Sequence, residues 1–221
     1  MDIEQARFNM IEQQIRTWEV LDQSVLDLLY VVRREEFVPE AYRALAFSDL
    51  EIPLSKNGAD DEKMLQPKVE ARILQEVAPH PTDRVLEVGS GSGYLTALLA
   101  SRAQQLYGVE ISPALQSMAE ANLRRAGIQN ASVELGDAAY GWAQHMPYDV
   151  IILGASTPEL PDTLLDQLNV GGRLFAVIGE APVMQARLYT RVTKASINAV
   201  VLFETCIAPL KNAAQREQFK F

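Results

Sequence analysis

Three glycines alternate with small residues in the stretch Val85–Tyr94, whose sequence is VLEVGSGSGY. A short apolar run that contains Glu87 precedes them, and an apolar helical pattern follows over 95–100. This order predicts a strand, a tight turn and the start of a helix, which together aim backbone N–H groups and the positive helix end at a ligand. Glycines suit such a turn because side chains would block the ligand and positive φ angles are needed. Glu87, near the mouth of the strand, could hold a cationic group of that ligand.

The spacing of the glycines separates two classes of ligand. A dinucleotide fingerprint reads G-x-G-x-x-G, whereas here Gly89, Gly91 and Gly93 are followed at once by Tyr94, and no P-loop lysine is present. A strand-borne Glu followed by G-x-G-x-G resembles motif I of S-adenosylmethionine (SAM)-dependent methyltransferases. The stretch therefore favours SAM over a nicotinamide dinucleotide, and an ordinary strand-to-helix turn is the alternative.

Two further acids follow predicted strands. Glu110 comes about twenty residues after Gly89, where an acid binds ribose hydroxyls in nucleotide-binding folds. Asp137 follows the next strand and could accept a hydrogen bond from an adenine amino group. In a doubly wound sheet the carboxyl ends of the strands form the ligand crevice, so these acids should lie near the glycine turn. The predicted cofactor-binding residues are Glu87, Gly89, Ser90, Gly91, Gly93, Glu110, Ile111 and Asp137.

Short apolar runs alternate with helical periods from Arg84 onward, which predicts a parallel sheet covered on both faces. We expect a doubly wound, Rossmann-like α/β fold with a mostly parallel sheet of about seven strands. The last two strands should form an antiparallel end of this sheet. The expected strands are 84–88, 105–110, 131–136, 148–154, 171–178, 185–193 and 198–208, and the expected helices of this part are 93–103, 113–126 and 160–168.

The first eighty residues form a helical extension. Helical apolar spacing covers 3–35, 41–54 reads as irregular, and 55–63 reads as a polar loop. Pro67 should open a helix that runs to about Ala78. The predicted organisation is a helical segment with a substrate-side loop over 1–80, a SAM-binding core over 81–210, and a polar, mobile tail over 211–221.

Composition excludes several classes of partner. The 221 residues are 48% hydrophobic and 22% charged, with a formal net charge of −9, which argues against a nucleic-acid partner. No apolar run is long enough to span a membrane, and the first residues do not form a signal peptide. Cys206 is the only cysteine, which suits the cytoplasm. No metal-ligand spacing is present, because the acids of 60–62 fit no calcium loop. The oligomeric state stays open.

The chain resembles the protein-L-isoaspartate O-methyltransferase family over nearly its whole length. The segment RREEFVPE within 33–40 is far more specific to that family than the glycine turn, which many methyltransferases share. The matching stretches are 10–15, 25–26, 32–40, 46–54, 86–94, 136–137, 149–161 and 168–172. The resemblance implies contacts of the cofactor with Gly89, Gly91, Glu110, Asp137 and Ala138. It also implies methylation of the abnormal isoaspartyl carboxylate of damaged protein, as a step toward repair.

One segment departs from the family. Its members read roughly G-x-G-Q-T-I-S-x-P before the helix, and their Ser is assigned the active-site role. Counting back from Pro67, Leu65 stands at the Ser position and Lys63 at the Thr position, so no catalytic residue is assigned. A carboxylate acceptor is already ionised at neutral pH and needs no general base. The acidic run 60–62 would repel such an acceptor if it faced the site, and Lys63 could offset this.

The leading hypothesis is a SAM-dependent O-methyltransferase of the isoaspartyl type that acts on protein or peptide substrates. One alternative is a methyltransferase of the same fold with a small-molecule acceptor. Another is a non-catalytic SAM-binding protein that kept the pocket and lost the site. A NAD-dependent dehydrogenase is disfavoured by Tyr94 in the glycine turn.

Overall fold

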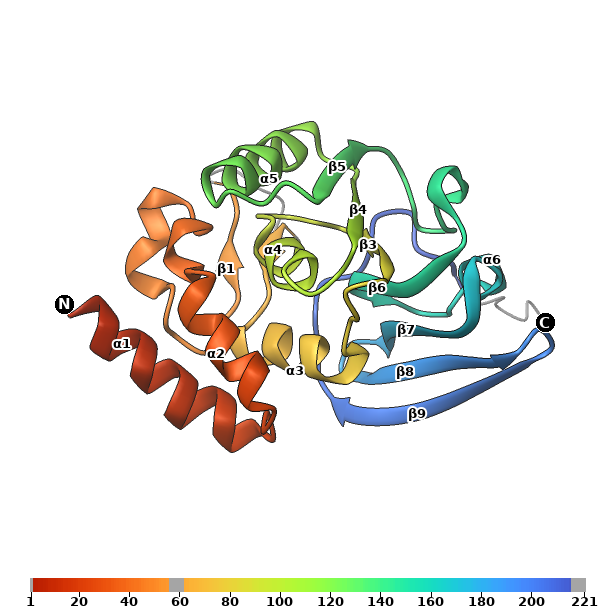
Figure 1. The fold of residues 1–221 in the computed structure, drawn as a ribbon, viewed down its shortest axis with the longest axis horizontal. Helices are drawn as coiled ribbons and strands as arrows, with labels where there is room; N and C mark the ends of the chain where they lie inside the picture. The colour runs from red at the N-terminus through yellow and green to blue at the C-terminus, as the bar shows by residue number, and fades with distance from the viewer. Residues whose placement is uncertain (1, 56–61, 216–221) are drawn as a thin grey trace.

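A seven-stranded sheet runs through the protein in the order β5-β4-β3-β6-β7-β8-β9 (Figure 1). The computed structural model describes residues 2–55 and 62–215. The pairs from β5 to β7 are parallel, whereas β8 and β9 pair antiparallel at one end. This confirms the predicted fold class. The strands are β3 (Arg84–Val88), β4 (Gln105–Glu110), β5 (Ala131–Leu135), β6 (Tyr148–Thr157), β7 (Leu168–Glu180), β8 (Val183–Thr193) and β9 (Ser196–Glu204).

Helices cover both faces of the sheet. Helices α3 (Pro67–Val77), α4 (Tyr94–Ala100) and α5 (Pro113–Arg125) pack on one face, and α6 (Asp162–Asp166) packs on the other. Side chains of β3 alternate between two apolar cores, so that Val85 joins the α3–α5 side while Leu86 and Val88 join the α6 side. This alternation is the two-residue period of a strand buried on both faces.

The N-terminal extension packs beside α3 and the sheet (Figure 1). Its elements are α1 (Ile3–Asn9), a π-helical segment (Met10–Ile15), three 3-10 turns (Arg16–Trp18, Arg34–Glu36 and Glu40–Leu45), and α2 (Gln23–Val31). Asp22 caps α2 by accepting a hydrogen bond from the Ser24 backbone N–H at 2.8 Å. The prediction of helices over 3–35 is confirmed, although this stretch consists of several helical elements with breaks between them.

Two predictions for the extension need correction. The segment 41–54 is not wholly irregular, because it contains most of the third 3-10 turn and the short strand β1 (Ile52–Pro53). Strand β1 pairs antiparallel with β2 (Lys63–Met64), so the predicted loop 55–63 ends inside a strand. A two-residue strand carries too little periodicity to be recognised from sequence. Residues 56–61 of that loop lie outside the described part of the chain.

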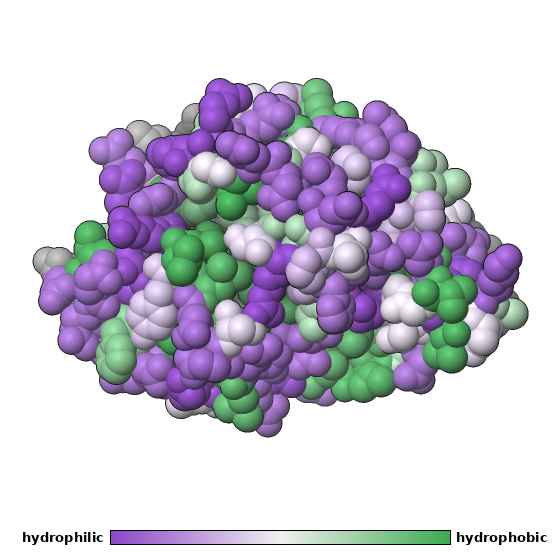
Figure 2. Space-filling view, in the orientation of Figure 1, coloured by the Kyte–Doolittle hydropathy of each residue, from purple (hydrophilic) through white to green (hydrophobic). Residues whose placement is uncertain are grey.

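The described helices include none that is both long and apolar enough to cross a membrane. The face of the molecule in Figure 2 is mostly hydrophilic, with apolar residues gathered in small, separate groups. A further 3-10 turn (Ala143–His145) lies between β5 and β6.

Arg34 connects the extension to the rest of the protein from a fully buried position, with 1% of the residue exposed. Its guanidinium forms an ion pair with Glu70 of α3. It also donates to the carbonyl oxygens of Leu65 at 2.5 Å and Ala46 at 3.1 Å, and lies 5.1 Å from the ring centre of Tyr94. Burial lowers the pKa of Arg34 to about 10, which still leaves it charged at neutral pH.

We therefore expect Arg34→Met to lower the free energy of unfolding by about 3–5 kcal/mol, because Glu70 would stay buried without its cation. Arg33→Met is the matched control, since Arg33 is an exposed neighbour whose nitrogen lies 3.7 Å from Glu36. The control should change stability by less than about 1 kcal/mol. Urea unfolding measures both variants. Equal losses in the free energy of unfolding would show that the buried pair contributes no more to stability than an exposed one.

Candidate functional site

A cleft opens at the carboxyl ends of β3, β4 and β6, and we call it the central cleft. With the adjoining open solvent included, it spans about 640 Å³. Two smaller spaces adjoin it, which we call the inner cavity and the outer cavity, and they span about 300 Å³ and 270 Å³ with open solvent included in the same way. Gly89 lines all three. The site thus extends along the sheet edge, with the inner cavity bordered by Glu87 and the outer one by Asp137.

The glycine turn gives the cleft a wall of bare backbone. Gly89 and Gly91 have φ angles of +85° and +53°, which residues with a Cβ rarely adopt. The Gly89 N–H donates to the Val109 carbonyl at 2.8 Å, which fixes the turn to β4. A Cβ on Gly91 would lie 3.1 Å from a methyl carbon of Leu54. The missing side chains leave space for a ligand to approach the backbone.

Gly93 has a different place from the other two glycines. Its φ is +82° and it caps α4, but it is not among the described residues that line the three spaces. A Cβ here would lie 3.2 Å from the backbone of Ala119. The structure therefore gives Gly93 a packing role, in the close approach of α4 to α5. Sequence alone could not separate this role from ligand contact, because both need glycine.

Glu110 stands at the end of β4 and lines both the central cleft and the outer cavity. One carboxylate oxygen accepts the Gly91 N–H and the other accepts the Ser112 N–H, both at 3.0 Å. These bonds hold the side chain, which is only 5% exposed. A carboxylate accepts about four hydrogen bonds, so capacity remains for ligand hydroxyls. Ile111 lines the same two spaces and offers an apolar surface beside the carboxylate.

Asp137 and Ala138 line the outer cavity, as the sequence predicts. One Asp137 oxygen accepts the Ala139 N–H at 3.0 Å, and the other accepts the side-chain amide of Asn212 at 2.8 Å. Asn212 thus competes for an oxygen that the sequence interpretation gave to an adenine amino group. Sequence reasoning missed Asn212 because it falls in the predicted tail.

The segment 208–211, which ends at the first residue of this predicted tail, forms a wall of the cleft. Ala208, Pro209, Leu210 and Lys211 line the central cleft. The Leu210 N–H donates to the Ser156 carbonyl at 2.8 Å, which ties the segment to β6. The described part of the tail, 211–215, therefore begins as part of the site. The apolar residues Ile207, Leu210 and Ala213 are spaced three apart, and this spacing could have indicated that the segment packs against the protein. The first and last of them are buried.

Glu87 is buried on the α4 side of β3 and lines the inner cavity together with Ser90 and Ser92. Burial raises the pKa of Glu87 to about 7, although the Thr96 hydroxyl donates to its carboxylate and favours the charged form. An acid with this pKa is partly protonated near neutral pH. A cationic ligand group in the inner cavity would favour its ionised form.

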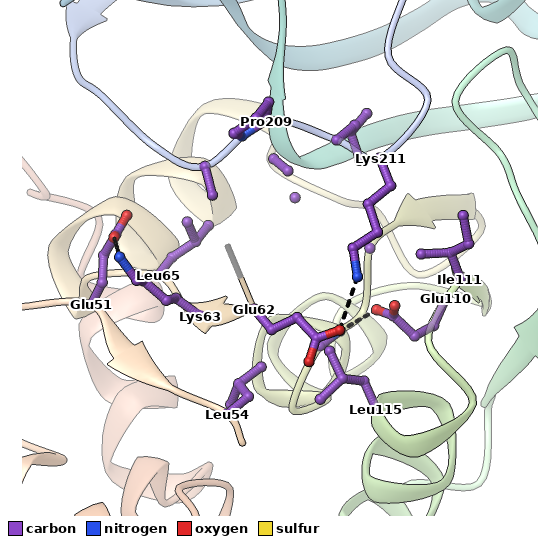
Figure 3. A pocket seen from close by; sticks show the side chains of 16 residues that line it. Glu51, Leu54, Glu62, Lys63, Leu65, Glu110, Ile111, Leu115, Pro209 and Lys211 are labelled. Atoms are coloured by element: carbon purple, nitrogen blue, oxygen red, sulfur yellow. Dashed lines mark hydrogen bonds and ion pairs between the residues drawn. The ribbon is translucent and has the colours of Figure 1, made fainter. Parts of the chain in front are cut away.

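Figure 3 shows the opposite side of the central cleft, across from Glu110 and Ile111. Leu65 lines the central cleft and the inner cavity, with its carbonyl held by Arg34. Lys63 lines the same two spaces. The carboxylates that border this side are paired, Glu51 with Lys63 at 3.7 Å and Glu62 with Lys211 at 2.9 Å. The net repulsion expected from the acidic run is thus reduced at Glu62, while Asp60 and Asp61 lie outside the described residues.

No group of three or more potential metal ligands of the His, Cys, Asp and Glu types occurs within 2–55 and 62–215. The site instead combines a bare-backbone turn, a fixed carboxylate, an apolar neighbour and a buried acid of raised pKa. This arrangement can hold an elongated ligand with hydroxyl groups in its middle and a cationic group at its inner end.

The family model of the protein-L-isoaspartate(D-aspartate) O-methyltransferases matches residues 5–215. A protein-L-isoaspartate O-methyltransferase of Methanospirillum hungatei JF-1 is 36% identical over 188 residues, which make up 85% of this chain and 84% of the relative. Another, of Herpetosiphon aurantiacus, is 38% identical over 178 residues, or 80% of this chain and 78% of the relative.

Solved structures share the fold. A protein-L-isoaspartate O-methyltransferase superposes with a TM-score of 0.79 at 24% identity, and the match covers 95% of this chain and 66% of that one. A Plasmodium falciparum protein, described as a candidate protein-L-isoaspartate O-methyltransferase in complex with S-adenosyl-L-homocysteine, has a TM-score of 0.75 at 24% identity. That match covers 92% of this chain and 97% of the other.

The raised pKa of Glu87 predicts a pH dependence of stability. Folded Glu87 keeps its proton to about pH 7, whereas the unfolded chain releases it near the ordinary value of 4.5. Unfolding therefore releases a proton in this window, and rising pH lowers the free energy of unfolding, by about 3 kcal/mol for this group. In Glu87→Gln the loss of stability between pH 5 and pH 8 should be smaller by about that amount. Urea unfolding at both pH values measures it, and an unchanged pH dependence would contradict the assignment.

Proposed function

This chain belongs to the protein-L-isoaspartate(D-aspartate) O-methyltransferase family of SAM-dependent enzymes, and we propose that it methylates the free carboxylate of isoaspartyl residues in damaged protein. The observation that carries the proposal is the placement of Leu65 and Lys63 across the central cleft from Glu110 (Figure 3). A cofactor bound along the glycine turn would lie beside this space, so that its methyl group could face an acceptor there.

The residues of the three spaces fit the parts of SAM. Glu110 would accept hydrogen bonds from the ribose hydroxyls, and Ile111 would contact the adenine. Asp137 and Ala138 would border the adenine in the outer cavity. Glu87 would attract the cationic amino-acid end from the inner cavity. When bound, SAM supplies an activated methyl group, which moves to the acceptor oxygen as its bond to sulfur breaks.

The protein's own part in the reaction is to position the acceptor and to exclude water. An isoaspartyl carboxylate is ionised at neutral pH, so no general base has to remove a proton. Leu54, Leu65 and Pro209 give the central cleft apolar walls. Charge is neutralised when a carboxylate receives a methyl group from a sulfonium, and a water-poor cleft favours such a step. The loss of the family's Ser therefore removes one orienting contact and leaves the chemistry possible.

The direct test is methyl transfer from labelled SAM to an isoaspartyl peptide, compared with a peptide of the same sequence that contains ordinary aspartate. We expect transfer to the isoaspartyl peptide alone. Transfer to neither peptide would refute the proposed substrate. Turnover of small carboxylic acids without the peptide would point to a small-molecule methyltransferase, and tight SAM binding without any turnover would point to a non-catalytic protein.

The cofactor contacts are tested separately by Glu110→Ala. This change removes the proposed acceptor of the ribose hydroxyls and should weaken SAM binding by about 1–3 kcal/mol, the range of a lost hydrogen bond to a charged group. Glu204→Ala is the control, because Glu204 is an exposed acid at the end of β9 and lines none of the three spaces. Isothermal calorimetry measures both. Equal affinities would show that the ribose lies elsewhere.

A further inference from the structure

We call the side of the central cleft opposite Glu110 the acceptor side, and Lys63 is the lysine of interest there. Lys63 lines both the central cleft and the inner cavity, where Glu87 and the glycine turn are also found. Lys211 lines the central cleft and the outer cavity, which is the proposed adenine end. Among the described lysines, Lys63 is thus the one that lines both the central cleft and the inner cavity.

The partner of Lys63 holds it loosely. Its ammonium nitrogen lies 3.7 Å from the nearest Glu51 oxygen, which is beyond hydrogen-bond distance. Two other lysines of this region form tighter pairs, Lys68 with Asp49 at 2.7 Å and Lys211 with Glu62 at 2.9 Å. The Lys63 side chain is also 36% exposed. Lys63 could therefore leave Glu51 and bind another carboxylate without breaking a direct hydrogen bond.

The charges around the cleft favour a cation as the binding group for an anionic acceptor. Glu51, Glu62 and Glu110 all line the central cleft, and the pairing of Glu62 with Lys211 only reduces their repulsion of a carboxylate. Lys211 is held by Glu62, so its charge is largely compensated. The neighbouring Leu65, at the position of the family's Ser, offers no polar side-chain atom to an acceptor.

We propose that Lys63 binds the carboxylate of the acceptor, exchanging Glu51 for the substrate, and so takes over the orienting contact that Leu65 cannot make. This inference rests on the proposed function. A carboxylate oxygen forms the new bond to the methyl carbon, the carbon–sulfur bond breaks with its electrons going to sulfur, and the ammonium keeps its protons throughout. The methyl ester is neutral, so Lys63 loses its attraction for the product and returns to Glu51. The same residue would thus favour binding of the acid and release of the ester.

The first experiment measures steady-state methylation of an isoaspartyl peptide by Lys63→Met, Lys63→Arg and the control Lys194→Met. Lys194 is exposed in the turn between β8 and β9 and lines none of the three spaces. We expect Lys63→Met to raise KM for the peptide about tenfold or more, the effect of losing one charge-assisted contact. Lys63→Arg should restore most of the affinity, and Lys194→Met should match the wild type. Urea unfolding, compared with that of the wild type, reports whether all three variants are intact.

The second experiment tests Glu51, whose substitution should change KM for the peptide in the opposite direction. Glu51→Gln removes the competitor of the substrate carboxylate, so KM for the peptide should fall several-fold. The double variant Lys63→Met with Glu51→Gln should lose this gain. In the presence of S-adenosyl-L-homocysteine, a peptide whose isoaspartyl carboxylate is replaced by an amide should bind the wild type more weakly than the acid peptide does, and Lys63→Met should bind the two with similar affinity.

The outcomes separate the inference from the proposed function. If the wild type methylates the isoaspartyl peptide and KM is the same in Lys63→Met, the role of Lys63 is refuted while the function stands. If the wild type does not methylate the peptide at all, the proposed function fails and the inference fails with it. A rise in KM for Lys63→Met together with a fall for Glu51→Gln supports the carboxylate exchange.

Discussion

The buried ion pair between Arg34 and Glu70 is the interaction on which the arrangement of the site depends. Because the same guanidinium also holds the carbonyl of Leu65, it fixes the chain that enters α3 and with it the acceptor side of the central cleft. Two buried charges are costly unless each is fully satisfied. Here the cost secures a defined position for the N-terminal extension against α3 and the ring of Tyr94, which opens α4. The extension is therefore a structural part of the site.

The two sides of the cleft are built by different means. The cofactor side is formed by backbone: a turn whose positive φ angles require glycine at 89 and 91, and strand ends that the sheet brings together. The side that we propose for the acceptor is formed by side chains of β2 and of Leu65 directly after it, where a substitution changes the charge without disturbing the seven-stranded sheet. Substitutions at positions 63 and 65 can therefore change the chemistry of this side while the glycine turn keeps its conformation.

The sequence predicted the parallel core, its antiparallel end and the place of Glu110, because buried strands and glycine turns leave strong local patterns. It did not predict that Gly93 serves helix packing or that Asn212 contacts Asp137. Nor could it show the pairing of Glu62 with Lys211, which lie 149 positions apart. The last two are contacts of single polar residues between distant segments, and such contacts leave no periodic pattern in the sequence.

The most direct test of the account is a crystal structure with S-adenosyl-L-homocysteine and an isoaspartyl peptide bound together. We expect the ribose hydroxyls to lie on Glu110 and the peptide carboxylate to lie between the cofactor sulfur and the ammonium of Lys63, with Glu51 displaced. A peptide carboxylate bound outside the space lined by Leu65 and Lys63, or a ribose away from Glu110, would contradict it.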